Sequence, residues 1–77
     1  MKDLLVILAK ALVDNPDEVS VNEKENSEQT VVLELSVADN DMGKVIGKQG
    51  RIAKSIRTVM KAAASRENKK VIVEIVQ

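Results

Sequence analysis

A cluster of glycines and lysines in the middle of the chain is the segment best suited to binding chemistry. All three glycines fall within "GKVIGKQGRIAKSIR", residues 43–57. A glycine loses the most backbone freedom on folding, so it recurs where φ must be positive or where another group must approach the backbone closely. Without β-carbons at Gly47 and Gly50, a sugar-phosphate backbone can lie against the loop, where Lys48 offers a charge and Gln49 a hydrogen bond. The structural alternative is a tight turn between two helices.

Two predicted helices flank this loop. The segment 39–46 predicts a short helix with Asp39 or Asn40 as its N-cap, and Gly47 can end that helix as a left-handed residue. From residue 51 to about 66, apolar residues recur at the spacing of an amphipathic helix: Ile52, Ile56, Val59, Met60 and Ala63. Gly50 opens this second helix, where free N–H groups and the positive end of the helix dipole favour an anion.

The rest of the chain predicts one more helix and three strands. Residues 3–14 form a wide apolar stripe that ends before Pro16, and residues 19–24 and 30–38 read as a hairpin. In the second of these strands Val31, Leu33, Leu35 and Val37 face the same way. The β-branched run 71–76 suits a strand covered on much of its surface.

The predicted order is α-β-β-α-α-β, an α+β fold. The β-α-α-β portion is a crossover, and such crossovers are right-handed and make their two strands parallel. We therefore expect a three-stranded mixed sheet with all helices packed on one face. The 77 residues predict a single small domain spanning 1–77, without disulfides because the chain has no cysteine.

Charge is divided along the chain although the net charge is zero. Residues 1–43 hold ten acidic and three basic side chains, whereas residues 44–77 hold nine basic and two acidic ones. Such a division favours an anionic ligand at the basic end, although exposed lysine-rich helix faces are common. The apolar stretch 4–13 is interrupted by Lys10 and is shorter than the ~20 residues of a membrane helix. It has no features of a targeting signal, so we expect a cytoplasmic protein without membrane association.

Several function classes fit the sequence poorly. Because the chain has no histidine or cysteine, it lacks the usual groups for acid–base or nucleophilic catalysis, and we expect no enzyme activity and no cofactor. Asp39 and Asp41 are better explained as helix-capping residues than as metal ligands, so no metal site is expected. A nucleotide-binding P-loop is excluded, because Gln49 stands where Ser or Thr is needed and the glycine spacing is one residue short. Without aromatic residues, RRM and OB folds, which stack bases on aromatic rings, are also disfavoured.

The segment "VIGKQGRIAKSI", residues 45–56, resembles the core motif of KH domains, in which two apolar residues precede a Gly-x-x-Gly loop and an amphipathic helix. The element order is similar to the type II, prokaryotic arrangement. Over essentially its whole length the chain resembles the small bacterial single-domain KH proteins of the KhpA type. The resemblance implies single-stranded RNA binding, because KH domains clamp about four nucleotides with this loop.

Roles for individual residues follow from the resemblance. It implies that Gly47 and Gly50 contact the RNA backbone, that Lys48 and Gln49 face phosphate, and that the strand 71–76 forms the far wall of a groove. One of the two apolar residues before the loop should line the floor of that groove, and basic residues beside the loop are candidate phosphate contacts; these are Val45 and Ile46, and Lys44, Arg51 and Lys54.

The sequence leaves three questions open. Ala53 stands where many KH domains have a bulky apolar residue, so a base preference cannot be carried over. Gly43 allows either the close approach of a ligand or a neighbouring strand to the short helix, or a packing contact between small residues. The resemblance implies an RNA chaperone or post-transcriptional regulator that pairs with itself or with a larger KH-containing protein. The alternative is a protein-interaction or dimerisation scaffold with little RNA binding, to which the helix 4–13 contributes.

Overall fold

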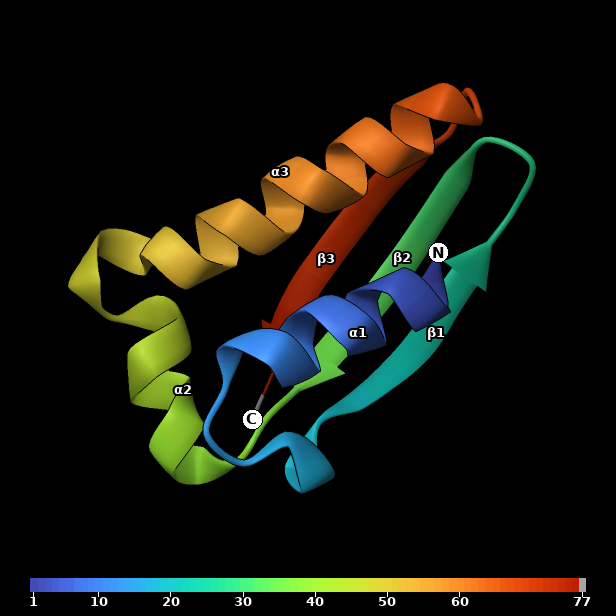
Figure 1. The fold of residues 1–77 in the computed structure, drawn as a ribbon. Coiled ribbons are helices and arrows are strands. Elements are labelled where there is room, and N and C mark those ends of the chain that lie inside the picture. The colour runs from blue at the N-terminus through green and yellow to red at the C-terminus, as the bar shows by residue number, and fades with distance from the viewer. Residues whose placement is uncertain (77) are drawn as a thin grey trace.

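The predicted order of elements is confirmed in the computed structural model, which describes residues 1–76 (Figure 1). The side chain of Lys48 also lies outside the described part. The elements are α1 (Lys2–Leu12), a 3-10 turn η1 (Pro16–Glu18), β1 (Ser20–Asn26), β2 (Thr30–Ser36), α2 (Asp39–Ile46), a second 3-10 turn η2 (Lys48–Gly50), α3 (Arg51–Arg66) and β3 (Lys70–Val76).

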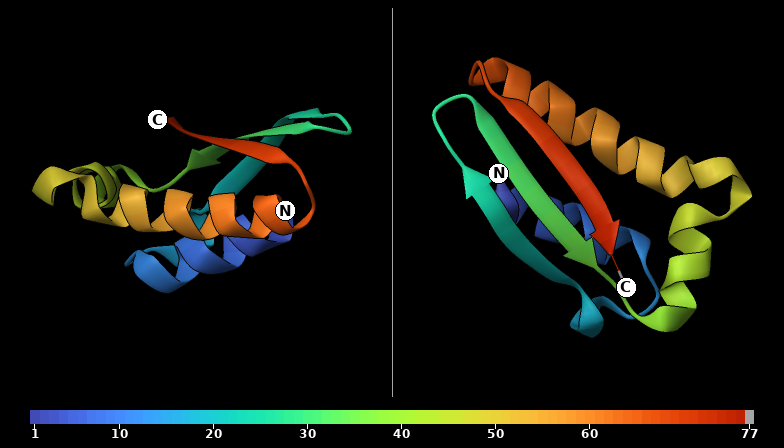
Figure 2. Two further views of the ribbon diagram at one scale, coloured as in Figure 1. Left: turned by 90° about the horizontal axis from the view of Figure 1, so that it is seen from above. Right: turned by 180° about the vertical axis from the view of Figure 1, so that it is seen from behind.

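The sheet has the predicted mixed topology. Its strand order is β1-β2-β3, with β1 antiparallel to β2 and β3 parallel to β2. The register pairs Ser20 with Ser36 in the hairpin and Leu33 with Val73 across the crossover. The helices lie on one side of the sheet (Figure 2), with α1 and α3 side by side across it and α2 beyond the end where β2 leaves.

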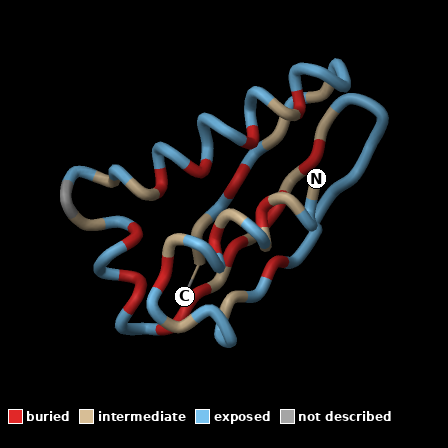
Figure 3. Tube along the Cα trace, viewed as in Figure 1, coloured by how far each residue is buried: buried red, intermediate tan, exposed pale blue. Residues whose placement is uncertain are grey.

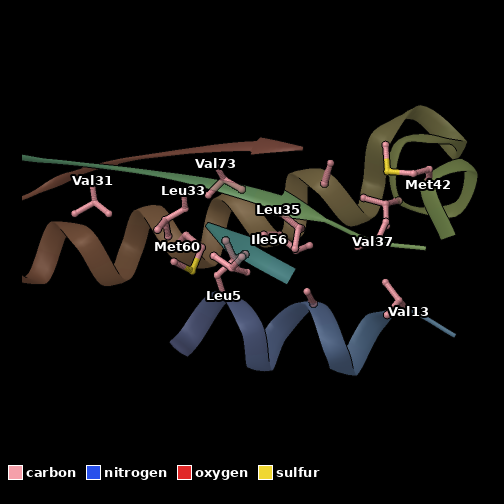
Figure 4. Packing of buried hydrophobic residues seen from close by; sticks show 14 residues of the cluster. Leu5, Val13, Val31, Leu33, Leu35, Val37, Met42, Ile56, Met60 and Val73 are labelled. Carbon is pink, nitrogen blue, oxygen red and sulfur yellow. The ribbon is translucent and has the colours of Figure 1, made fainter. Parts of the chain in front are cut away.

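A continuous aliphatic core fills the space between the sheet and the helices (Figure 4). The alternating residues of β2 point into it as predicted, and Leu33 and Leu35 are fully buried. They meet Leu5 of α1 and Met60 of α3, which are buried as well. Burial of Leu- or Ile-sized side chains stabilises a fold by roughly 1.5–3 kcal/mol each, so this layer holds the domain together without aromatic residues.

The buried face of α3 differs from the predicted one. The fully covered residues are Ala53, Ile56, Met60 and Ala64, whereas Val59 is 42% exposed. Ala53 and Ala64 lie near the two ends of this buried face, and Ile56 and Met60 lie between them. Ala53 is therefore a core residue, and not part of an exposed groove floor.

Strand β3 is also more exposed than predicted. It lies at the edge of the sheet, and only Val73 is buried, while Ile72 on the opposite face is 39% exposed. On that open face Lys24 of β1 lies 3.5 Å from Glu34 of β2 and 3.6 Å from Glu74 of β3. The β-branched composition of β3 thus reflects strand propensity at an edge.

Candidate functional site

The loop between α2 and α3 turns the chain sharply from one helix into the next (Figure 1). Gly47 ends α2 in an extended conformation with φ −79° and ψ −177°, and Gly50, at φ 68°, stands just before the first residue of α3. The N–H of Gly50 donates to the carbonyl oxygen of Gly47 at 2.9 Å. Gln49 is itself left-handed at φ 65°, a conformation that costs a residue with a side chain roughly 1–2 kcal/mol. Two successive residues in this conformation turn the backbone from one helix into the other.

The prediction that Gly47 is left-handed was wrong, and its need for glycine has a different cause. The N–H of Gly47 donates to the carbonyl oxygen of Gly43 at 2.8 Å, and a β-carbon on Gly47 would collide with that same oxygen. Glycine is thus required at Gly47 by close backbone approach and at Gly50 by its positive φ. Because neither residue has a side chain, the backbone of the loop is open to an approaching molecule.

Gly43 has no such constraint in the structure. It lies exposed within α2, and a β-carbon there would meet no atom within 4 Å. The interpretation of Gly43 as a packing contact was therefore wrong. The close approach of a ligand is the remaining reason for a glycine at this place, and it stays a prediction.

The two apolar residues before the loop have different roles. Val45 is fully buried in the core, whereas Ile46 is 54% exposed. An exposed isoleucine directly before an open backbone loop is the feature expected of the floor of a binding groove. The sequence left open which of these two residues lines the groove floor. Because Val45 is buried, Ile46 is the candidate for that position.

The N-terminus of α3 offers polar contacts at the other end of the loop. No described side chain caps it by a hydrogen bond, and no acidic residue stands in its first turn. Arg51 and Lys54 are exposed there and take part in none of the ion pairs found within residues 1–76. Gln49 is exposed too, whereas the predicted phosphate contact of Lys48 falls on a side chain outside the described part (Figure 3). Lys44 forms an exposed ion pair with Asp14 at 3.1 Å, and its role as a phosphate contact stays a prediction.

Two basic residues were missed by the sequence reading, and they line a hollow between α3 and β3. This hollow, of about 290 Å³, is bounded by Arg57, Lys61, Val71, Ile72 and Val73. The Nε–H of Arg57 donates to the carbonyl oxygen of Val73 at 3.3 Å, so the guanidinium group lies against the edge of the sheet. The signal was present in the sequence, because Lys54, Arg57 and Lys61 are spaced i, i+3 and i+7 and so share one face of the helix. Strand β3 borders this hollow, and its role as the far wall of an RNA groove stays a prediction.

A buried carboxylate fixes the base of α2, and it was also missed. Asp41 is only 1% exposed and accepts hydrogen bonds from the N–H of Asp14 at 3.1 Å and from the N–H and side-chain amide of Asn15 at 3.0 and 3.1 Å. It joins α2 to the segment after α1. The predicted N-cap was wrong, since α2 is capped by Ala38 without any side-chain hydrogen bond.

The electrostatics of Asp41 follow from these contacts. Burial alone opposes its ionisation, but the hydrogen bonds from Asp14 and Asn15 and the nearby charge of Lys44 outweigh burial and lower the pKa of this carboxyl below its ordinary value of 3.8. The charged form is therefore the one that the fold stabilises. Within residues 1–76, no three His, Cys, Asp or Glu side chains are grouped so that they could hold a metal ion.

The α-β-β-α-α-β order, the mixed sheet and the Gly-x-x-Gly turn between α2 and α3 together define a KH domain of type II. The chain belongs to the KhpA/KhpB KH domain family, whose model matches residues 2–75.

Curated relatives agree with this assignment. The chain is 67% identical over 76 residues to a protein of Clostridium acetobutylicum named RNA-binding protein KhpA, covering 99% of this chain and all of the relative. A protein of the same name in Clostridium perfringens is 64% identical over the same shares of both chains. One in Aquifex aeolicus is 49% identical, covering all of this chain and 96% of the relative. These are names of binding proteins rather than of enzymes, and no solved structure was found to match the chain.

The glycines of α2 and the loop should respond in opposite ways to alanine. We expect Gly43→Ala to raise the free energy of unfolding by about 0.5–1 kcal/mol, because a helix interior favours alanine and the site has room. Gly47→Ala should lower it by roughly 1–3 kcal/mol, because the β-carbon must displace the Gly43 carbonyl. Urea unfolding followed by circular dichroism measures both variants. Equal stability of the Gly47 variant and the wild type would contradict the steric argument.

Asp41→Asn should destabilise the domain at neutral pH, lowering Tm by roughly 5 °C or more, because a buried charged acceptor of the Asp14 and Asn15 hydrogen bonds is replaced by a neutral amide. The lowered pKa means that the contribution of Asp41 is fully present above its ordinary value of 3.8 and is lost as the pH falls through the lower value of the folded state. The wild type should therefore lose stability over that acid range, and the variant should lose less. Asp39→Asn, exposed on the same turn, is the matched control. If Tm falls with pH in the same way in the wild type and both variants, Asp41 does not make this contribution.

Proposed function

We propose that residues 1–77 act as a single KH domain that binds single-stranded RNA. The Gly47–Gly50 loop holds the sugar-phosphate backbone, and the bases lie over aliphatic surface beside it. The observation that carries the proposal is the exposure of Ile46 directly before the loop. The two glycines of that loop have no side chains, so its backbone is accessible.

The surroundings of the loop support this role. Lys48 and Gln49 stand between the glycines, and Arg51 and Lys54 follow on the first turn of α3. Further along, Arg57 and Lys61 continue the basic face beside the hollow at β3. RNA-binding proteins without aromatic residues depend on such backbone contacts and aliphatic walls, because stacking on aromatic rings is not open to them. The names of the relatives point to the same ligand.

The expected binding is weak and sensitive to salt. One KH groove holds about four nucleotides, and each phosphate neutralised on a single strand contributes about −0.7 to the slope of log affinity against log salt. A domain of this kind gains useful specificity through a second domain or a partner. We infer a role as a cytoplasmic RNA chaperone or post-transcriptional regulator that pairs with itself or with a larger KH-containing protein.

Replacing Lys48 and Gln49 by aspartate should abolish RNA binding while leaving the fold intact. The change adds repulsion at the site proposed for phosphate, so we expect affinity for short fluorescent single-stranded RNA at low salt to fall at least roughly tenfold. Lys10→Asp with Ala11→Asp makes the same change in net charge on exposed positions of α1 and serves as control. Circular dichroism checks folding. If the loop variant binds as tightly as the wild type, or the wild type does not bind, the scaffold function takes precedence.

A dimerisation function is favoured by one observation of its own. Ile7 on α1 is 65% exposed, the largest exposure of any large apolar side chain found within residues 1–76, and Val59 on α3 is 42% exposed. Pairing through these helix faces would remove both from water and leave the loop free. Sedimentation velocity should show a dimer of the wild type that Ile7→Glu weakens by roughly tenfold or more in dissociation constant. A monomeric wild type at high concentration contradicts it.

A further inference from the structure

A second, larger hollow lies at the opposite end of α3 from the Gly-x-x-Gly loop. Its open volume is about 770 Å³, and its polar lining residues are Gln29, Lys61, Ser65, Asn68, Lys69 and Lys70. Three parts of the chain meet there: the turn of the β1–β2 hairpin, the last turns of α3 and the start of β3 (Figure 2).

The backbone around this hollow is fixed by hydrogen bonds. Asn68 takes a left-handed conformation at φ 57°, so the N–H of Lys69 can donate back to the carbonyl oxygen of Ala64 at 2.9 Å and that of Asn68 to Ser65 at 3.1 Å. This is the closure that satisfies the final carbonyl groups of a helix. The N–H of Lys70 donates to the carbonyl oxygen of Gln29 at 2.8 Å, which ties the hairpin to β3.

The lining chemistry suits a phosphate group. Lys61, Lys69 and Lys70 supply three positive charges, while the amides of Gln29 and Asn68 supply hydrogen-bond donors. None of the described residues that line the hollow is acidic. The negative end of the α3 dipole is weakened here, because carbonyl groups of its last turn already accept hydrogen bonds.

A continuous basic face connects this hollow to the loop. Lys54, Arg57, Lys61 and Ser65 follow one another at i, i+3, i+7 and i+11, and Lys61 lines both hollows. From Gly50 to Ser65 the helix rises about 22 Å, at 1.5 Å per residue. A strand held at the loop and extended along α3 therefore passes Arg57 before it reaches the lysines at the far end.

We propose that this hollow is a second phosphate subsite, which binds the part of a single-stranded RNA that extends past the nucleotides held at the loop. The inference rests on the proposed function and deepens it, because it makes the length of RNA bound greater than one KH groove. The ammonium groups of Lys69 and Lys70 contact phosphates of these additional nucleotides, and sequence is not read there. Lys69 keeps donors for this contact, because its ammonium group has three N–H donors and gives one to the side-chain oxygen of Asn26 at 3.4 Å.

The test compares two RNA lengths. A ten-nucleotide strand offers about seven positions to a four-nucleotide site, so position counting alone gives a gain of about sevenfold over a tetranucleotide. For the wild type at low salt, we expect the ratio of ten-nucleotide to tetranucleotide affinity to be roughly ten times larger than this sevenfold factor. Lys69→Glu with Lys70→Glu should remove the excess and lower the salt slope by about 1.4 for the longer RNA, while changing tetranucleotide affinity by less than about twofold.

Controls separate the two levels of the proposal. Lys2→Glu with Lys10→Glu makes the same change in net charge on α1 and should preserve the excess. Lys70→Glu alone replaces the double variant if the latter does not fold. A gain no greater than the sevenfold factor, or an equal loss of both RNAs in the Lys69/Lys70 variant, overturns the subsite while leaving the loop function standing. Failure of the wild type to bind either RNA overturns both.

Discussion

The close approach of Gly47 to the carbonyl oxygen of Gly43 is the constraint from which the site follows. It ends α2 abruptly, and the two left-handed residues after it send the chain directly into α3. Within α2, Val45 lies in the core, whereas Ile46, directly before Gly47, is exposed. An open backbone and an exposed apolar side chain therefore stand at adjacent positions.

The edge strand of the sheet forms one wall of both hollows. Because β3 returns parallel to β2, it lies beside α3, and two basic side chains of the helix, Arg57 and Lys61, line the hollow between them. Ten of the twelve acidic residues come before residue 44, and the other two are Glu67 and Glu74. The basic second half of the chain thus supplies the charged side chains beside β3, and such a surface would attract an anionic strand.

Local patterns predicted the elements well, and contacts between distant segments set the limits of that prediction. The alternation of β2 and the amphipathic spacing of α3 depend on neighbouring residues, so both were evident in the sequence. The role of Asp41 was not, because its partners Asp14 and Asn15 are about 26 residues away and come within reach only after folding. The conformation of Gly47 and the burial of Val45 likewise depend on how α2 meets its neighbours. Arg57 and Lys61 could have been found, since their helical spacing from Lys54 is a local signal.

The parallel crossover also sets the order in which the molecule can assemble. The β1–β2 hairpin joins Asn26 to Val31 across a short turn, whereas the pairing of Thr30 with Lys70 closes a loop of forty residues. Long loops lose more chain entropy on closure, so we expect the hairpin to form early and β3 to dock late. Both hollows have β3 as a wall. A ligand that spans α3 and β3 therefore favours the last step of folding, and its binding free energy adds directly to the stability of the native state.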